Sequence, residues 1–153
     1  MTLLHLRAAS ASDAYALWIW ANDPESRKAS FGRELIPWES HIVWLRAVLE
    51  SPHHLLLLAV TSGDQPVGTI RFDTLDAWGT ARLSYLVAPE ARGRRLASAL
   101  ISTGLERCRH VVGRSSIVEA TVDVHNERSL RVFRRLDWRE AQDGRAIIFR
   151  KES

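Results

Sequence analysis

The sequence predicts an α/β fold with a mixed central sheet, and three observations support this prediction. Segments with the periodicity of strands and helices follow one another in the order β-α-α-β-β-β-α-β-α-β. The turn-forming stretch Ser62–Pro66 separates two apolar runs and predicts an antiparallel hairpin. The stretch Ala81–Ile101, ARLSYLVAPEARGRRLASALI, passes from a β-prone run through a short turn into an amphipathic helix. No repeat, low-complexity tract or long linker divides the chain, so residues 1–153 are expected to form one domain.

Each expected element has a local sequence signal. Pro37 opens the second helix, because proline is favoured in a first helical turn, and the apolar residues between Ile42 and Leu49 have helical spacing. The run His54–Val60 has the character of a buried strand, and Asn22-Asp23-Pro24 is expected to end the first helix. In chain order the elements are a strand at 3–7, a helix at 12–21, a helix from 37, strands at 54–60, 67–72 and 83–87, a helix from 96, a strand at 116–124, a helix at 127–136 and a strand at 146–151.

The composition is that of a soluble globular protein. Of the 153 residues, 46% are hydrophobic and 25% are charged, and the formal net charge is +3. Arginines alternate with acidic residues through most of the expected helices, which indicates solvated helix faces. Nucleic-acid binders usually concentrate more positive charge, interleaved with aromatic residues, on one face. We therefore expect no nucleic-acid partner.

The cysteine content and the apolar segments argue against a secreted or membrane protein. The single cysteine, Cys108, excludes an internal disulfide and a cysteine-rich metal site, and a packed thiol is a better interpretation of it than a nucleophile. Arg7 interrupts the apolar run of the N-terminal segment and makes it a poor signal peptide. The longest apolar run, Leu55–Val60, is too short to span a bilayer. The expected location is the cytoplasm, with no membrane partner.

The turn at 92–95, Arg-Gly-Arg-Arg, has the properties of a phosphate-binding turn. It follows the strand at 83–87 and opens directly into the helix that starts near Leu96. The first N–H groups of a helix have no intrahelical acceptor, and the helix dipole adds about half a positive charge there. The three arginine side chains of the turn add formal charge at the same place. An ordinary strand–turn–helix unit with surface arginines is the alternative interpretation.

Two motifs resemble the GNAT superfamily of acetyl-CoA-dependent N-acetyltransferases. The family's signature Gln/Arg-x-x-Gly-x-Gly/Ala is matched at its first and last positions by Arg92 and Ala97, while Arg95 occupies the place of the middle glycine. A second motif starts with Asn126-Glu127-Arg128-Ser129 and ends with Leu136-Asp137-Trp138, and it resembles the family's Asn-x-x-Ser/Ala helix with its Leu-Gly-Phe ending. The resemblance covers nearly the whole chain. It implies a mixed, mostly antiparallel sheet with about four flanking helices, splayed at the cofactor strand.

The resemblance implies acetyl-CoA as the co-substrate and no metal. In the family, backbone N–H groups of the turn bind the cofactor pyrophosphate, so the Arg95 side chain can point outward and matters only if that position needs a positive φ. The pantetheine arm then lies along the strand that ends at Val87, which in the family carries a bulge and splays from its parallel neighbour. A backbone N–H at or near Val87 would act as the oxyanion donor. The implied cofactor-binding residues are Leu86, Val87, Arg92, Gly93, Arg94, Arg95, Leu96, Ala97, Ser98, Asn126, Ser129 and Phe133.

The reaction needs a base, because an alkyl amine is mostly protonated near neutral pH. Strand alternation places Glu119 and His125 on one polar face, which makes Glu119 the first candidate base and His125 the second. A solvent-facing polar row is the alternative. Phe133 stands where many family members carry a tyrosine acid, and Thr121 where members that acetylate ribosomal proteins carry a glutamate. Tyr85 is the substitute candidate for the acid, or else an aromatic residue of the core or cleft wall.

The N-terminal third resembles one branch of the same family. The stretches 20–27, WANDPESR, and 36–45, IPWESHIVWL, resemble the opening of enzymes that acetylate 4-amino sugars on nucleotide carriers. Trp38 and Trp44 can stack on a sugar or a uracil ring, or can pack helix against sheet, and Arg27 can meet a diphosphate or remain surface charge. The expected function is acetyl transfer from acetyl-CoA to a primary amine, that of an amino sugar or a nucleotide-linked amino sugar. A protein or peptide amine as acceptor, and a non-catalytic acyl-CoA-binding module, are the alternatives; a monomer and a homodimer are both compatible with the sequence.

Overall fold

The computed structural model of the chain describes residues 3–74, 79–112 and 117–152. Within them, seven strands form one sheet in the order β1-β2-β3-β4-β5-β7-β6, and every neighbouring pair is antiparallel except β4 and β5. The mixed, mostly antiparallel sheet predicted from the sequence is confirmed. The strands are β1 His5–Ala8, β2 His54–Val60, β3 Pro66–Thr74, β4 Ala81–Val87, β5 Ile117–Asp123, β6 Arg139–Asp143 and β7 Ala146–Glu152.

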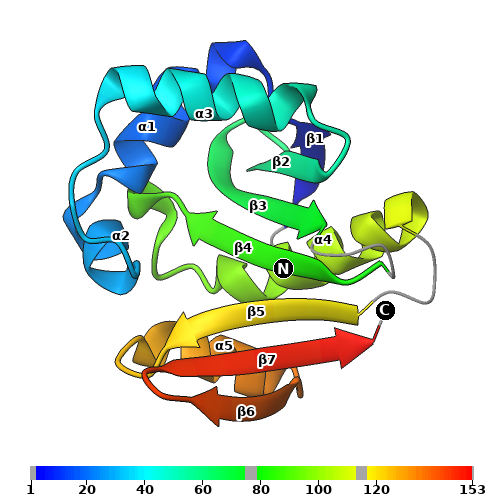
Figure 1. Cartoon of the computed structure of the whole chain (residues 1–153). Coiled ribbons are helices and arrows are strands. Elements are labelled where there is room, and N and C mark those ends of the chain that lie inside the picture. Colours follow the sequence, from blue (N-terminus) through cyan, green and yellow to red (C-terminus); the bar gives the residue numbers. More distant parts are fainter. Residues whose placement is uncertain (1–2, 75–78, 113–116, 153) are drawn as a thin grey trace.

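Helices cover both faces of the sheet (Figure 1). On one face α3 packs over β2 with α1 beside it, and on the opposite face α4 packs against β3 and β4 with α5 next to it. The helices of the described residues are α1 Ala14–Ala21, α2 Pro24–Ala29, α3 Trp38–Glu50, α4 Leu96–Val112 and α5 Glu127–Arg135, with short 3₁₀ turns η1 Ala11–Asp13 and η2 Pro89–Ala91. None of these helices has the length and apolar character needed to cross a bilayer.

The core lies between the sheet and these two helical layers. Five consecutive residues of β2, Leu56–Val60, are buried, because helices cover the sheet on both sides at this strand. On the α4 side, Gly104 lies so close to Ile70 of β3 that a side chain at this position would overlap it. The apolar run at 54–60 therefore forms a central strand, as its sequence predicted.

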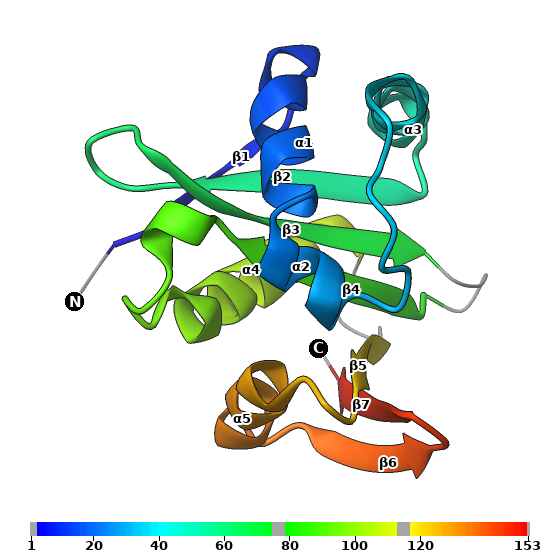
Figure 2. The same cartoon turned by 90° about the vertical axis from the view of Figure 1, so that its left-hand side faces the viewer.

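The two parallel strands separate from each other along their length. Within the described residues, β4 and β5 pair only at Ala81 with Val118 and at Arg82 with Glu119. Beyond these pairs the strands diverge, and the opening faces the end where β4 leads into α4 (Figures 1 and 2). The splay at this strand, predicted from the family resemblance, is confirmed. We call the opening the split.

The bulge expected in β4 is not present. β3 and β4 pair without interruption from Gly68 with Val87 to Thr74 with Ala81. A shift of register does occur in the sheet, but between β2 and β3, at Ala59 and Val60. The split therefore arises because β5 turns away, while β4 keeps its full ladder with β3.

Two elements of the structure were not predicted. Asn22-Asp23-Pro24 ends α1 as expected, but Asp23 and Pro24 also begin α2: the Asp23 carboxylate accepts the N–H groups of Glu25 and Ser26, and Pro24 occupies the first helical position. β6 is exposed along its whole length and pairs only with β7, so its sequence shows no alternation of apolar and polar residues. Ser116, the predicted start of β5, lies outside the described residues.

His41 and Cys108 both have structural roles, and for Cys108 the sequence predicted a packed thiol. His41 is buried, and its Nε2 lies 2.8 Å from the carbonyl oxygen of Ala14, so Nε2 carries the proton and donates it. Burial lowers the pKa of His41, which keeps the ring neutral. The hydrogen bond from His41 to Ala14 holds α3 against α1. Cys108 is buried on α4, and burial raises the pKa of its thiol, which is the opposite of what a nucleophile needs.

Candidate active site

The turn between β4 and α4 carries unpaired backbone donors. Leu96, Ala97 and Ser98 form the first turn of α4, so their N–H groups have no intrahelical acceptor. Among the backbone hydrogen bonds recorded outside helices and strands in the described residues, none uses an N–H group between Gly93 and Ser98. Together with the positive end of the α4 dipole, these donors form a site that fits a diphosphate.

Arg95 adopts a backbone conformation that normally favours glycine. Its φ is +58°, and that of Gly93 is +81°, so both positions of this turn lie in the left-handed region. A non-glycine residue costs about 1–2 kcal/mol in this conformation. The side chains of Arg94 and Arg95 are exposed, and no ion pair of either is recorded within the described part of the chain. They add positive charge beside the N–H groups without filling the turn.

Gly93→Ala is expected to lower the free energy of unfolding by about 1–2 kcal/mol. A Cβ at Gly93 meets nothing within 4 Å, so the loss comes from the backbone strain at φ +81° and not from a clash. Gly32→Ala is the matched control, because a Cβ there also meets nothing within 4 Å and its φ is not positive. Chemical denaturation of both variants measures the difference. Equal stability of the two would show that Gly93 does not need its positive φ.

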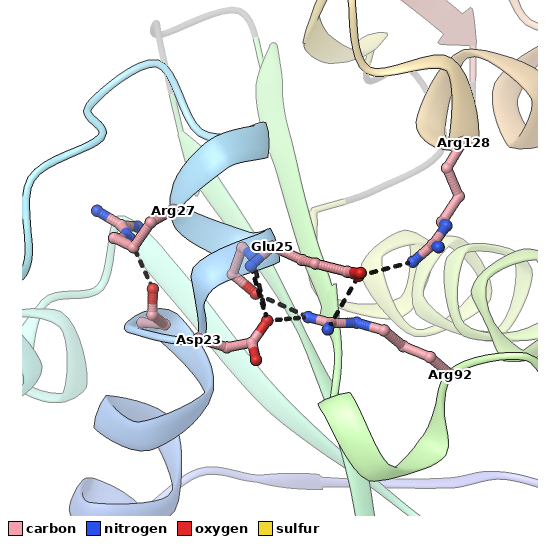
Figure 3. Close-up of polar contacts among 7 residues, drawn as sticks. Asp23, Glu25, Arg27, Arg92 and Arg128 are labelled. Carbon is pink, nitrogen blue, oxygen red and sulfur yellow. Dashed lines mark hydrogen bonds and ion pairs between the residues drawn. The ribbon is translucent and has the colours of Figure 1, made fainter.

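Arg92, the first residue of the turn, points away from these donors and toward α2 (Figure 3). Its Nη2 lies 2.7 Å from Oδ2 of Asp23 and 3.0 Å from Oγ of Ser26, and its Nη1 lies 3.1 Å from Oε2 of Glu25. The Arg92 side chain therefore fixes α2 against the turn. Its guanidinium is not placed to serve as a free phosphate ligand in this arrangement.

The carboxylate of Glu25, in α2, connects the two sides of the split. Glu25 accepts from Arg92 and also lies 3.5 Å from Nη1 of Arg128, at the start of α5 (Figure 3). Desolvation alone would raise the pKa of Asp23, but the Arg92 guanidinium and the N–H groups of Ser26 and Glu25 outweigh it and lower the pKa. Asp23 is thus ionised and paired. The contacts of Glu25 with Arg92 and Arg128 thus link the turn before α4 to the start of α5 (Figure 3).

The edge of β4 that faces the split points backbone donors into it. The N–H of Ala88 donates to the carbonyl oxygen of Val67 on β3, at 2.8 Å. Because N–H groups alternate sides along a strand, the N–H of Leu86 also faces β3, while those of Tyr85 and Val87 face the split. The N–H groups of Val87, the predicted oxyanion donor, and of Tyr85 thus lie on the edge of β4 that borders the split.

Behind the split, the side chain of Tyr85 reaches α5. Its Oη lies 2.5 Å from Oγ of Ser129, and its ring packs edge-on against Phe133, with ring centroids 5.9 Å apart. Burial raises the pKa of Tyr85, so the phenol keeps its proton at neutral pH. Phe133 is buried, and Asn126 accepts the N–H of Ser129 at 3.3 Å as the cap of α5. The predicted residues of α5 therefore form the wall that faces Tyr85.

Glu119 lies at the closed end of the split. It stands opposite Arg82 in the last β4–β5 pair, and its carboxylate accepts a hydrogen bond from Nε of Arg150 at 3.1 Å. β5 ends at Asp123, and His125 lies exposed in the following turn, where its N–H donates to the Asp123 carboxylate at 2.8 Å. The strand alternation that paired His125 with Glu119 therefore stops before His125.

On the face covered by α1 and α3, aromatic rings form a row. The rings of Trp18, Trp38, His41 and Trp44 follow one another with centroid separations of 5.2, 6.0 and 5.7 Å. Trp38 and Trp44 are 37% and 38% exposed. The two tryptophans thus hold the helices together and also present ring surface to solvent.

Arg27 fixes the local backbone. Its Nε donates to the carbonyl oxygen of Ala21 at 2.6 Å, and its Nη1 donates to those of Gly32 and Glu34 at 2.9 and 3.2 Å (Figure 3 shows the first of these). A guanidinium used in this way has little capacity left for a diphosphate. The sequence left open a diphosphate contact or surface charge for Arg27, and these contacts show instead that its guanidinium binds backbone carbonyl oxygens.

Taken together, these features define a coenzyme A-dependent acyltransferase. A helix N-terminus with unpaired donors fits the diphosphate, and a strand edge with free N–H groups fits the amide-containing arm. Within the residues that the structure describes, no group of three or more His, Cys, Asp or Glu side chains is arranged to hold a metal ion. Residues 4–139 match the family model described as an acetyltransferase (GNAT) domain, and the chain belongs to this family. It is an acetyl-CoA-dependent N-acetyltransferase, with acetyl-CoA as its co-substrate.

Solved structures with this fold include three acetyltransferases. The spermidine N-acetyltransferase of Vibrio cholerae, in complex with CoA and spermine, is 15% identical over 96% of this chain and 92% of that chain, with a TM-score of 0.83. The ribosomal-protein-alanine N-acetyltransferase of Brucella melitensis is 20% identical over 97% and 99%, with a TM-score of 0.78. A putative acetyltransferase of Salmonella typhimurium with acetyl-CoA is 17% identical over 97% and 93%, with a TM-score of 0.76. A search of curated proteins gave no match. At these identities the likeness shows the fold, and it does not single out the amino-sugar branch.

Proposed function

We propose that the acceptor is the primary amine of a small molecule, an amino sugar or a nucleotide-linked amino sugar. The observation that carries the proposal is the split, which has the N–H groups of Tyr85 and Val87 along its β4 wall and the carboxylate of Glu119 at its closed end. The partly exposed rings of Trp38 and Trp44 lie on the same side of the sheet as Glu119 and can stack on a sugar or a base. Such rings are typical of sites that bind flat or ring-shaped ligands.

The turn residues would hold the co-substrate by its phosphates. The N–H groups from Gly93 to Ser98 would donate to the diphosphate, and the exposed guanidinium groups of Arg94 and Arg95 would add charge. The β4 edge from Val87 back to Tyr85 would donate to the pantetheine arm and to the thioester oxygen. Acetyl-CoA supplies the reactive thioester when bound.

The remaining residues would move protons during a direct attack, with no covalent enzyme intermediate. Glu119 would take a proton from the ammonium form of the acceptor, and Arg150 would hold the carboxylate in place at 3.1 Å. Tyr85, whose phenol is protonated and hydrogen-bonded to Ser129, would protonate the leaving thiolate in place of the tyrosine that Phe133 replaces. His125 stays a second candidate for the base, on the strength of its position after β5.

The first experiment is a calorimetric titration with acetyl-CoA, with adenosine 3′,5′-bisphosphate as a control for the nucleotide part. Micromolar binding of acetyl-CoA is expected, followed by thiol release when amino sugars are added and none when the amine is omitted. Faster release with peptides than with amino sugars would favour a protein amine as acceptor. Binding without any release would favour a non-catalytic acyl-CoA-binding module.

Glu119→Gln is expected to lower kcat/KM by about a hundredfold at low pH. The loss of kcat/KM should shrink as the pH approaches the pKa of the acceptor amine, because an amine that is already neutral needs no base. A pH–rate profile of thiol release measures this, with Glu50→Gln as the control, since Glu50 is exposed at the end of α3. A profile of unchanged shape would exclude Glu119 as the base.

A further inference from the structure

A row of charged and polar side chains crosses the sheet at the closed end of the split. Register partners on neighbouring strands are His54 with Asp73, Asp73 with Arg82, Arg82 with Glu119, and Glu119 with Arg150. Directly opposite residues on neighbouring strands point to the same face of the sheet. One continuous row therefore runs from β2 through β4 to β7.

The row lies on the face of α3, opposite to the one on which α4 packs. Arg71, two residues before Asp73 on β3, has its guanidinium 5.3 Å from the ring centroid of Trp44 on α3. Residues two apart on a strand share a face, so Arg82 projects on the α3 side. Ile70 of β3 lies against Gly104 of α4, and Tyr85 is the register partner of Ile70 on β4. Tyr85 therefore projects on the α4 side. An acceptor that lies on the α3 side would meet Arg82 where the split closes.

The acidic side chains around the split are already paired with cations. Asp73 accepts from Arg71 and from His54, Glu119 accepts from Arg150, and Asp23 accepts from Arg92. The arginines of the row and its surroundings at 71, 82 and 150 outnumber the carboxylates at 73 and 119 by three to two. Among these five described residues, the positive formal charges thus exceed the negative ones by one.

Arg82 is a cation of this row for which no partner is recorded among the described residues. It is exposed, and within the described residues no hydrogen bond or ion pair of its guanidinium is recorded. Arg71 is its diagonal neighbour across β3 and β4, at about 7–8 Å along the sheet. Because Arg71 uses Nε to bind Asp73, its outer nitrogens can point toward the same ligand.

We propose that Arg82, assisted by Arg71, binds an anionic group of the acceptor, so that the substrate is an amine that also carries a phosphate or a carboxylate. This inference rests on the proposed N-acetyltransferase function and narrows its substrate class. A polyamine is disfavoured, because it needs free carboxylates and would meet an unpaired arginine. An arginine guanidinium suits both anions, since its N–H groups bind phosphate and carboxylate in pairs.

The first test measures the melting temperature of the protein saturated with CoA, which occupies the phosphate turn, as inorganic phosphate or acetate is added. Binding to the folded state raises the melting temperature. The shift at a given phosphate concentration is expected to be smaller for Arg82→Gln than for the wild type. Arg107→Gln is the matched control: it removes the same charge from an exposed position on α4, on the opposite face of the sheet. It should keep the wild-type shift.

The second test compares thiol release for matched acceptors: glucosamine with its phosphate ester, and methioninamide with methionine, with spermidine as a cationic acceptor. The charged member of a pair should be preferred, and Arg82→Gln should reduce that preference about tenfold or more while Arg107→Gln does not. A phosphate preference without a carboxylate preference would identify the anion. Arg82→Lys should keep part of the preference for the anionic acceptor that Arg82→Gln loses, because lysine retains the charge but lacks the paired N–H groups.

The outcomes separate this inference from the proposed function on which it rests. Equal phosphate shifts in all three proteins, or faster release with spermidine than with every anionic acceptor, would overturn the role of Arg82 and leave the acetyltransferase function intact. Failure of the protein to bind CoA at all, measured before any acceptor is added, would instead overturn both.

Discussion

Ala97→Glu is expected to abolish acetyl-CoA binding, with a loss of affinity of at least about a hundredfold. Ala97 is the second residue of α4, and its N–H belongs to the group that has no intrahelical acceptor. A carboxylate there would place a negative charge beside the diphosphate. Two like charges about 4 Å apart repel by about 4 kcal/mol near a protein surface, which exceeds the 2.7 kcal/mol of a hundredfold change.

The same substitution is expected to leave the stability of the free protein unchanged or slightly higher. A negative side chain in the first turn of a helix is favoured by the helix dipole, by about 0.3–1 kcal/mol. Binding and folding therefore respond in opposite directions, and misfolding cannot imitate the result. Calorimetric titration and thermal unfolding on the same sample measure both quantities.

Two further variants show where the effect comes from. Ser102→Glu adds the same side chain to an exposed position further along α4 and should leave the affinity for acetyl-CoA within about threefold of the wild type, because the charge lies more than a turn away from the phosphates. Ala97→Gln adds similar bulk without charge. Its loss of affinity for acetyl-CoA would measure the steric part of the loss seen with Ala97→Glu. Full affinity in Ala97→Glu would exclude the turn as the phosphate site.

The fold was largely predictable because its periodic elements carry their own signals. The buried run at 54–60, the turn at 62–66 and the strand–turn–helix unit at 81–101 all appear where the sequence placed them. α2 was missed although Asp23 and Pro24 carry a cap and a first-turn signal, because these two residues directly follow the C-cap of α1 and belong to the stretch that signals its end. β6 gave no signal, since a strand without a buried face has no pattern to detect.

The candidate site was predictable where chemistry depends on the backbone, and less so where it depends on tertiary pairing. The unpaired N–H groups of the turn follow from the helix start at Leu96, which the sequence showed. The pairing of Arg92 with Asp23 joins residues 69 positions apart, and no local pattern encodes it. Alternation assigned Glu119 to one face of β5, but it could not show that the strand ends before His125 or that Arg150 pairs with Glu119. The place of Arg82 beside Glu119 and Asp73 likewise depends on the strand register, which no local pattern encodes.

Gly68→Ala is expected to destabilise the protein by about 3 kcal/mol or more, because it would force β3 and β4 apart. A Cβ at Gly68 would lie 2.5 Å from the carbonyl oxygen of Leu86 and 3.4 Å from Cα of Val87. These are backbone atoms of the strand that lines the split, so they cannot move aside as the end of a flexible side chain can. A typical domain has only about 5–15 kcal/mol of stability, so the loss is large.

The control for this prediction is Gly63→Ala, in the turn between β2 and β3. A Cβ there meets only Oγ1 of Thr61, at 3.9 Å, so its free energy of unfolding should change by less than about 1 kcal/mol. If Gly68→Ala still folds at low temperature, its affinity for acetyl-CoA should fall as well, because the displaced backbone at Leu86 and Val87 carries the N–H that faces the split. Stability equal to that of Gly63→Ala would mean that β4 can shift without cost. The precise spacing of β3 and β4 would then not be what holds the N–H of Val87 in place.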